Sequence, residues 1–370
     1  MEIKEGLAKI KLKQNVFFNP KMKICRDLTS LWISTLGKIN ILVDGFCASG
    51  IRGIRYKLEN KNVNQLVFFD RSKTAILNTT ENLKLNKLEG KVFEGNSNKF
   101  FVNYQNFDFC EIDPFGSPAP YLDSLFWADY KQKRRFISIT ATDTAVLCGA
   151  HKNACIKIYG SKPAHNFICH EIGLRILIGF VAKVAAKYDW EIIPHLCFSS
   201  LHFFKLFLEI KKSASGAVKS VGLSNFLYLF CSNCLYQSKA DLFLPPSKIC
   251  PNCGKELNFF GPIWSGQLAD LNVVEEMKKN YQKKDYLQSK DLEKFLNVYR
   301  QEISICDFYY DIHKISSKYK VPIVPSNLLI ESLAEQGFLA SRSTFLSTAI
   351  RTNASISQIL QTINNLNKKI

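Results

Sequence analysis

Strand-like apolar runs alternate with helical patterns between residues 40 and 212, and this alternation restricts the possible folds more than any other feature. Five runs are each followed by a turn or a helical pattern, which is typical of βαβ units around a parallel sheet. Two further runs follow, so we predict an α/β fold with a sheet of about seven strands. The strands are expected in INILVD, NQLVFFD, KVFEG, FDFCEID, RRFISITATD, WEIIPHL and HFFKLFLEI.

The chain changes character twice after this region. Residues 213–222, SASGAVKSVG, are small and are predicted to be a linker. Residues 226–260 hold four cysteines and little regular pattern, whereas helical patterns dominate from residue 266 and end in a short hairpin and a last helix. We therefore predict three parts: residues 1–225 with the sheet and an N-terminal extension, a cysteine-rich segment at 226–262, and a mainly helical domain at 263–370.

The charge of the chain is strongly positive. Its 49 Lys and Arg residues exceed its 32 Asp and Glu residues, for a formal net charge of +17. Such an excess favours a polyanionic partner, RNA or DNA, although a generally basic soluble protein would show it too. With 46% hydrophobic and 22% charged residues, the composition is that of a globular chain rather than a disordered one.

Neither a secretory signal nor a membrane span is expected. The opening residues, MEIKEG, lack the apolar core of a signal peptide. The most apolar helical segment, residues 168–186, contains Glu171, Arg175 and Lys183, so it lacks the ~20 uncharged residues of a span. We predict that it packs on the sheet. Twelve cysteines without a signal indicate a reducing compartment, so we expect a cytoplasmic protein with no membrane contact.

The first candidate site is the turn DGFCASGIRG at residues 44–53. A buried strand ends at Asp44, small residues follow, and a helix begins after Gly50, so a ligand can approach the backbone at a helix N-terminus. Asp70 ends the next strand, where an acidic side chain binds ribose hydroxyls. Dinucleotides and S-adenosylmethionine both bind in this way. Phe46 and Ala48 replace the early glycines of the dinucleotide pattern, and Asp44 suits a cationic sulfonium. A tight turn without a ligand remains an alternative.

The second candidate site is EIDPFGSPAP at residues 111–120, directly after the fourth strand. A nucleobase amine is a poor nucleophile, so its methylation requires the amine to be held in line with the methyl group. The Asp113 carboxylate can accept hydrogen bonds from such an amine and stabilise developing positive charge. The Pro114 carbonyl can accept the second N–H, and Phe115 can stack on an extruded base. The alternative is an Asx-type turn with a packing phenylalanine.

The third candidate site is a set of four cysteines with the spacing C-x2-C-x15-C-x2-C. Cys231, Cys234, Cys250 and Cys253 match a four-thiolate zinc site, and this ligand set leaves no open position, so we predict structural zinc. The other cysteines are predicted to be core or turn residues, and no acid–base role is predicted for the histidines. These other cysteines are Cys25, Cys47, Cys110, Cys148, Cys155, Cys169, Cys197 and Cys306.

Several long motifs in one order resemble a known family. DGFCASGIRGIR, DPFGSPAPYLDS, VFFNPKM, CRDLTS, TATDTAVLCGAHKNACIKIYGSKP, CHEIGLRILIGF and GPIWSGQL are similar to motifs of the tRNA guanine-N2 dimethyltransferases that act at position 26. The chain lacks the long terminal extensions of the eukaryotic members and resembles the archaeal form. The resemblance implies a class I Rossmann-like methyltransferase sheet, followed by a region that holds the tRNA. With the cysteine spacing, we expect a four-cysteine zinc ribbon and then a mainly helical C-terminal domain, for which a winged-helix-like module is considered. No membrane contact is expected, and no obligate protein partner is evident from the sequence.

The resemblance also implies roles for individual residues. Two S-adenosylmethionine molecules would be used in turn to form N2-methylguanosine and then N2,N2-dimethylguanosine. Arg26 and Asp44 would lie near the methionine part of the cofactor, Asp70 would hold its ribose, and Asp113, Pro114 and Phe115 would bind the target guanine. Two departures stand out: Cys25 replaces a common asparagine, and Asn96-Ser97 replaces the Asp-Ala pair that faces the adenine. The expected cofactor-binding residues are Arg26, Asp44, Gly50, Arg52, Asp70, Arg71, Asn96 and Ser97.

Two other functional classes are considered. A non-catalytic, zinc-containing RNA-binding protein would need the cysteine segment and the C-terminal SNLLIESLAEQGFLASRSTF, but neither Asp113 nor Asp70. An NAD-linked oxidoreductase is suggested only by the βα turn, and its missing glycines argue against it. The sequence leaves open whether one or two methyl groups are added, and which further tRNA positions are modified.

Overall fold

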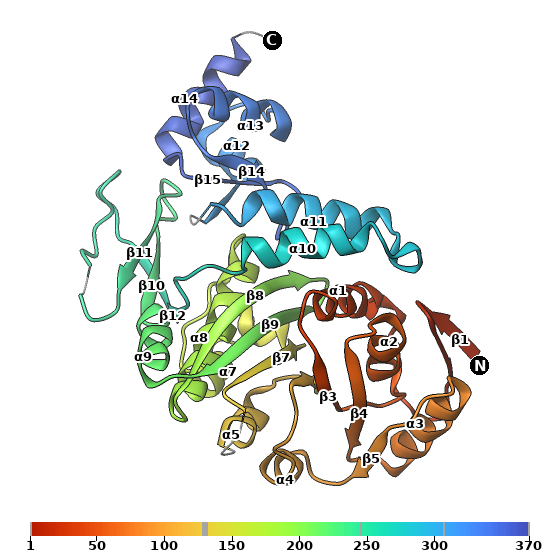
Figure 1. The fold of residues 1–370 in the computed structure, drawn as a ribbon. Helices are drawn as coiled ribbons and strands as arrows, with labels where there is room; N and C mark the ends of the chain where they lie inside the picture. Colours follow the sequence, from red (N-terminus) through yellow and green to blue (C-terminus); the bar gives the residue numbers. More distant parts are fainter. Residues whose placement is uncertain (1, 128–131, 245, 306–307, 369–370) are drawn as a thin grey trace.

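The computed structural model describes residues 2–127, 132–244, 246–305 and 308–368. A seven-stranded sheet forms its centre, as predicted (Figure 1). The first five strands of the sheet are parallel, but β9 is antiparallel to both of its neighbours, so the sheet is mixed rather than wholly parallel. In spatial order the strands are β5 (Lys91–Glu94), β4 (Val63–Asp70), β3 (Ile39–Gly45), β6 (Phe109–Ile112), β7 (Arg134–Ala141), β9 (Phe203–Lys212) and β8 (Trp190–Ser200).

Helices cover both faces of the sheet. Successive strand residues point to opposite faces, so Leu42 and Phe68 belong to one buried cluster while Val43 and Phe69 belong to the other. The Leu42 face is covered by α1 (Lys23–Ile33), α2 (Ile51–Glu59) and α3 (Lys73–Leu85). The Val43 face is covered by α4 (Ser97–Asn103), α5 (Ala119–Trp127) and α8 (Cys169–Ala186). The helix predicted near residues 168–186 thus packs on the sheet, as expected.

The small-residue segment predicted to be a linker is instead helix α9 (Ala214–Leu223). Ser213 caps it by accepting a hydrogen bond from the Gly216 N–H at 3.0 Å. Gly216 and Ala217 are buried where α9 packs against α8 and β8. Here small residues allow α9 to approach its neighbours closely. A run of small residues is also typical of a flexible linker, so the sequence alone does not distinguish the two.

The cysteine-rich segment contains more regular structure than predicted. It forms an antiparallel sheet in the order β11-β10-β12, which projects from the main body (Figure 1). The strands are β10 (Phe226–Phe230), β11 (Gln237–Asp241) and β12 (Asn258–Ile263). The strand β12 packs against α8, so this sheet is attached to the large sheet through a helix of the main core.

The C-terminal part is mainly helical with a small sheet of order β13-β15-β14. The predicted hairpin and last helix are confirmed as β14, β15 and α14. Helix α10 packs on α1 and β8, which places the C-terminal part beside one edge of the large sheet (Figure 1). The elements are α10 (Leu271–Tyr281), α11 (Lys290–Glu302), β13 (Tyr309–Asp311), α12 (Ile312–Tyr319), α13 (Ser326–Glu335), β14 (Ala340–Arg342), β15 (Ala349–Thr352) and α14 (Ile356–Asn367).

Short elements complete the chain. An N-terminal hairpin, β1 (Glu2–Glu5) and β2 (Ala8–Lys11), contacts α2 and α3. Helices α6 (Thr144–Leu147) and α7 (Lys152–Tyr159) connect β7 to α8, and single 3-10 turns occupy Pro20–Met22 and Asp285–Leu287. Within the described residues, no helix is both long and apolar enough to cross a membrane.

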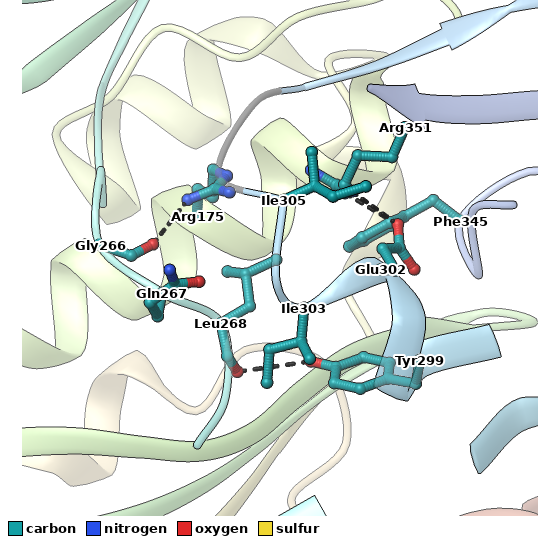
Figure 2. A pocket seen from close by; sticks show the side chains of 10 residues that line it. All are labelled: Arg175, Gly266, Gln267, Leu268, Tyr299, Glu302, Ile303, Ile305, Phe345 and Arg351. Atoms are coloured by element: carbon teal, nitrogen blue, oxygen red, sulfur yellow. Dashed lines mark hydrogen bonds and ion pairs between the residues drawn. The ribbon is translucent and has the colours of Figure 1, made fainter. Parts of the chain in front are cut away.

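A buried ion-pair network joins the C-terminal part to α8. Arg351 of β15 contacts Glu171 at 2.8 Å and Glu302 of α11 at 2.9 Å, and Arg175 contacts Glu171 at 2.9 Å. A cavity of about 20 Å³, room for about one water molecule, lies beside this network (Figure 2). The four charged side chains are nearly inaccessible to solvent, so the network fixes the relative position of the two parts.

Candidate active site

A cavity of about 430 Å³ lies at the carboxyl ends of β3, β4 and β6, where ligands bind in open α/β sheets. The turns after these strands form one wall, and residues 15–19 and 22 of the N-terminal segment form another. Eight of the eleven predicted cofactor and guanine residues line the cavity: Arg26, Arg52, Asp70, Arg71, Ser97, Asp113, Pro114 and Phe115. Asp44, Gly50 and Asn96, all within the described chain, are not among its lining residues.

The β3–α2 turn is built around Asp44. Gly50 adopts a left-handed conformation, with φ of 75°, and begins α2. The helix then approaches the strand so closely that a Cβ on Gly53 would lie 3.2 Å from the Cβ of Asp44 and 2.5 Å from the Phe68 ring. The Gly53 N–H donates a hydrogen bond to Asp44 Oδ2 at 2.9 Å. Helix α2 thus begins directly over the carboxylate.

The Asp44 carboxyl is buried in an acidic environment. Burial raises its pKa to about 7, the Gly53 hydrogen bond opposes this shift, and the charge of Glu111 on the adjacent strand adds to it. Its second oxygen, Oδ1, has no hydrogen-bond partner among the described residues. An unpaired buried carboxylate oxygen is costly, so the site is suited to a positively charged group nearby.

Asp70 and Arg71 lie on the cavity wall after β4. The Asp70 carboxylate accepts hydrogen bonds from the Ala48 N–H at 3.0 Å and the Ser72 N–H at 2.9 Å. Asp70 therefore joins the β3–α2 turn to the β4–α3 turn. Each carboxylate oxygen can accept a further hydrogen bond, so ribose hydroxyls can still bind there.

Asn96 and Ser97, in the segment after β5, have different structural roles. Ser97 lines the cavity, whereas the Asn96 amide oxygen caps α4 by accepting hydrogen bonds from Asn98 and Lys99 N–H groups at 3.0 and 3.2 Å. The expected contact of Asn96 with an adenine would have to share this oxygen with the helix cap. Its role as an adenine ligand remains a prediction.

Arg26 is fixed in position by the N-terminal hairpin. Its guanidinium makes two hydrogen bonds to Glu5, at 2.6 Å each, and lies over the Phe18 ring with a distance of 5.1 Å from Cζ to the ring centroid. Arg55 contacts the same Glu5 carboxylate at 2.7 Å. Arg26 therefore reaches the cavity wall as part of a rigid, largely buried charge cluster.

The Asp113 loop carries a second charge cluster. Arg52 contacts Asp113 Oδ2 through Nε at 2.8 Å and Nη2 at 2.5 Å. Burial raises the pKa of Asp113, but the charges of Arg52 and Lys205 outweigh it and hold the pKa below its ordinary value. Lys205 is fully buried, bonded to Glu111 and to the Thr140 hydroxyl. Asp113 is thus kept ionised at the mouth of the cavity.

Two aromatic rings stand beside this carboxylate. Phe115 is 75% exposed and Phe17 is 53% exposed, which is unusual for side chains so apolar. Their ring centroids are 4.8 Å apart, and the rings meet edge to face at 81°. Hydrogen bonds between Gly116 and Thr142, at 2.8 and 2.9 Å, support the loop from below. An exposed aromatic pair on a rigid loop is a suitable stacking surface for a base.

The four predicted zinc ligands converge in the small sheet. The Sγ atoms of Cys231 and Cys253 are 3.5 Å apart, as are those of Cys234 and Cys250, and all four lie within 4.8 Å of one another. The two knuckles have matching backbones, since Leu235 and Gly254, which follow the second cysteine of each pair, have φ of 55° and 68°. These distances suit a tetrahedral four-thiolate zinc site, so the residues fit the metal.

Sequence reasoning missed three parts of the site. Phe17, Lys205 and Glu111 were not predicted, although FFNP at 17–20 and the charge within the apolar strand HFFKLFLEI were visible. A lysine in the middle of a buried strand needs a buried acidic partner, which is a usable signal. The motif FFNP marks Phe17 itself, but nothing in the sequence indicates its contact with Phe115, which is 98 positions away in the chain.

Comparison with known proteins decides the family. The sequence model described as N2,N2-dimethylguanosine tRNA methyltransferase matches residues 1–364. This chain belongs to that family. A tRNA (guanine(26)-N(2))-dimethyltransferase of Methanobrevibacter smithii is 36% identical, with 98% of this chain and 97% of that protein covered. An Aquifex aeolicus relative named for both guanine 26 and guanine 27 is 32% identical, with 98% and 96% covered.

A solved relative agrees in fold over the whole chain. The Trm1 protein of Pyrococcus horikoshii, in complex with S-adenosyl-L-methionine, has a TM-score of 0.88 and 31% sequence identity to this chain. The match covers 98% of this chain and 99% of that one. The predicted family and the predicted methyltransferase fold are therefore both confirmed.

The residues of this family member fit the cofactor that the family implies. The unpaired Asp44 Oδ1 is suited to a nearby sulfonium, and Asp70 lies across the same turn from Asp44. The cavity volume of about 430 Å³ lies within the range of about 300–1,000 Å³ that is usual for ligand sites. No feature of the dinucleotide pattern replaces the missing glycines, so the oxidoreductase alternative gains no support.

Proposed function

We propose that this chain is a tRNA (guanine(26)-N2)-dimethyltransferase, which transfers two methyl groups from S-adenosylmethionine to N2 of guanosine 26. Products would be N2-methylguanosine and then N2,N2-dimethylguanosine. The observation that supports this proposal most strongly is that the Asp113-Pro114-Phe115 loop and the turn after Asp70 line the same cavity. The non-catalytic RNA-binding alternative has no use for this shared cavity, and family membership also favours the enzyme.

When bound, S-adenosylmethionine supplies a methyl group attached to a positively charged sulfur. Asp70 binds the ribose hydroxyls, and Asp44 and Arg26 lie toward the charged methionine end. Because Arg26 already pairs with Glu5, its proposed role is to form the cavity wall beside the methionine carboxylate. Gly50, Arg52, Arg71 and Ser97 complete the proposed cofactor-binding set around these three residues.

Asp113 acts on the target guanine. Its carboxylate accepts a hydrogen bond from the N2 amine, and the Pro114 carbonyl accepts the other N–H of the unmodified base. Each transfer would form one N–C bond as the S–CH3 bond of the cofactor breaks, with S-adenosylhomocysteine as the leaving group and one proton passing from the nitrogen to water. Because Arg52 and Lys205 hold its pKa low, Asp113 stabilises the developing positive charge rather than taking up the proton in advance. Phe115 stacks on the extruded base, and the Phe17 ring, which meets Phe115 edge to face, borders it.

The tRNA-binding surface is assigned to the C-terminal part together with the small sheet. The order α11, β13, α12, α13, β14 and β15 places two consecutive helices before a two-stranded hairpin, which supports a winged-helix-like domain. The net charge of +17 favours binding to a phosphate backbone. We propose domain limits of 1–225, 226–262 and 263–370, four-cysteine zinc in the second, and a cytoplasmic location with tRNA as the partner.

The test is mass spectrometry of nucleosides from tRNA transcripts incubated with the protein and S-adenosylmethionine. One transcript carries guanosine at position 26, and a matched transcript carries adenosine there. We expect dimethylguanosine only in the first transcript. A third transcript, with adenosine at 26 and guanosine at 27, tests the second position named for the Aquifex aeolicus relative. Absence of methylated guanosine in every transcript would contradict the proposal.

A further inference from the structure

Two cysteines and a histidine outside the zinc ribbon converge on one point. Cys148 follows α6, while Cys169 and His170 begin α8, so the two segments are 21 residues apart in the chain. One Sγ or ring-nitrogen atom from each of the three lies within 4.8 Å of the others, and Cys148 Sγ is 3.7 Å from His170 Nδ1. All three side chains are partly exposed, so the cluster is accessible to solvent.

The spacing agrees with ligation of one metal ion. In a tetrahedral zinc site with usual bond lengths, a thiolate sulfur and an imidazole nitrogen are about 3.6 Å apart, and two sulfurs are about 3.8 Å apart. The 3.7 Å between Cys148 Sγ and His170 Nδ1 matches the first distance. The ribbon sulfurs, which approach to 3.5 Å, show how closely thiols of a ligand set come together in this same structure.

We propose that Cys148, Cys169 and His170 form a second metal site, with Zn²⁺ held by two thiolates and His170 Nδ1. This set leaves a fourth position, as in Cys2His zinc sites that carry an exchangeable ligand. His165 lies beside the cluster, with its Nδ1 3.1 Å from the Cys148 carbonyl, but it is not one of the three converging side chains. Water would occupy the fourth position.

One further polar group, on β8, borders the cluster. The Ser199 hydroxyl lies 3.3 Å from His170 Nδ1. This hydroxyl must turn away when Nδ1 binds a metal.

The metal would brace the catalytic loop. Cys148 ends a short segment that begins at Thr142, and Thr142 is bonded to Gly116 of the Asp113 loop. Within the same segment, Asp143 accepts a hydrogen bond from Tyr159, whose hydroxyl is 2.6 Å from the Ser117 hydroxyl. Fixing Cys148 to α8 therefore restrains the support beneath the residues proposed to bind the guanine.

Metal stoichiometry tests the proposal independently of methyl transfer. The full-length protein would be reconstituted with Zn²⁺ under reducing conditions, freed of loose metal by desalting, and analysed by mass spectrometry for zinc. We expect two equivalents in the wild type, one in Cys148→Ser/Cys169→Ser, and one in Cys231→Ser/Cys234→Ser. The control Cys155→Ala, a buried neighbour on α7 outside the cluster, should retain two.

A second measurement covers the case in which the double variant does not fold. Co²⁺ bound to the wild type should give two sets of ligand-field bands, and His170→Gln should change only one of them. One zinc equivalent in the wild type, or two in the folded Cys148→Ser/Cys169→Ser variant, would overturn the second site. Recovery of a Cys148–Cys169 disulfide in the reduced, zinc-treated protein would also overturn it.

Discussion

At the scale of single residues, the site depends on charges held away from water. Asp113 directly follows β6, and Asp44 lies in the neighbouring strand β3. Their environments nevertheless shift their pKa values in opposite directions. Arg52 and Lys205 compensate the charge of Asp113, whereas for Asp44 the Gly53 N–H and the charge of Arg52 do not outweigh burial. Two aspartates whose pKa values are separated in this way can take different chemical roles in one site.

Replacement of Asp113 tests its proposed role. Asp113→Asn keeps the size of the side chain but removes the negative charge, so kcat should fall by roughly 10²–10³-fold. The dissociation constant for S-adenosylmethionine should change little, and calorimetry measures it. Asp123→Asn, an exposed position bonded to Lys187 and Tyr188, is the matched control and should keep full activity. Retained turnover in Asp113→Asn would refute the role.

The raised pKa of Asp44 predicts pH-dependent cofactor binding. With a pKa of about 7, Asp44 is largely protonated below that pH, and a nearby sulfonium favours its ionised form. Affinity for S-adenosylmethionine should therefore weaken as pH falls from 8 to 6, with a proton released on binding at pH 6. Calorimetry in two buffers of different ionisation enthalpy measures this release. In Asp44→Asn the proton release should disappear, and its persistence would assign it to another group.

The folding contribution of Asp44 has the opposite sign from that of a salt-bridged carboxylate. Its folded pKa lies above the unfolded value, so folding takes up a proton between about pH 4 and 7 and stability decreases as pH rises through that range. Under the proposed function, this cost is offset when a cationic cofactor binds near the ionised form of Asp44.

At the scale of elements, the small sheet is expected to depend on the proposed zinc. Its own buried cluster contains few residues, so four thiolates with bound zinc would provide much of its stability. Removal of zinc by a chelator should increase hydrogen exchange in residues 226–263 first, while β3 and β4 stay protected. Exchange measured by mass spectrometry distinguishes these peptides. Tyr319 donates a hydrogen bond to the Cys234 carbonyl at 2.8 Å, so α12 should loosen next. Equal loosening of all elements would contradict this order.

At the scale of the whole molecule, the ion-pair network couples two parts of the chain. Arg351→Met leaves Glu302 without its buried ionic partner and removes one of the two partners of Glu171. Loss of one partner of a buried pair costs about 3–5 kcal/mol, so we expect a clear fall in Tm by calorimetry. Arg342→Met is the control, since Arg342 lies in the same small sheet but bonds to the exposed Asn327. Similar Tm values for both variants would show that the network adds little.

Binding of tRNA should be strongly salt-dependent. If only three phosphates are neutralised, counterion release predicts about 40-fold weaker binding at 200 mM salt than at 50 mM. Fluorescence anisotropy with a labelled tRNA measures the dependence, and a labelled uncharged oligomer serves as control. Affinity that is unchanged across this range would contradict the assignment of the positive charge to tRNA binding.

Local patterns in the sequence determined much of this protein. The seven strands, the cavity-lining Asp70 and Asp113 turns and the cysteine spacing follow from residues close together in the chain, because periodicity and turn chemistry are local properties. Local reasoning was wrong for residues 213–222, where small residues serve helix packing rather than flexibility. It also did not show that β9 runs antiparallel between β7 and β8, since strand direction depends on how the chain returns to the sheet.

Only the tertiary structure decided which distant residues meet. It brought Phe17 to Phe115, Lys205 to Glu111, and Cys148 to Cys169 and His170, pairs that no local pattern connects. It also showed that the Asn96 amide oxygen caps a helix, whereas the family resemblance had implied a contact with the adenine. The physical reason is that the role of a side chain depends on the charges and surfaces around it. Folding around a shared core brings these neighbours together from remote parts of the chain.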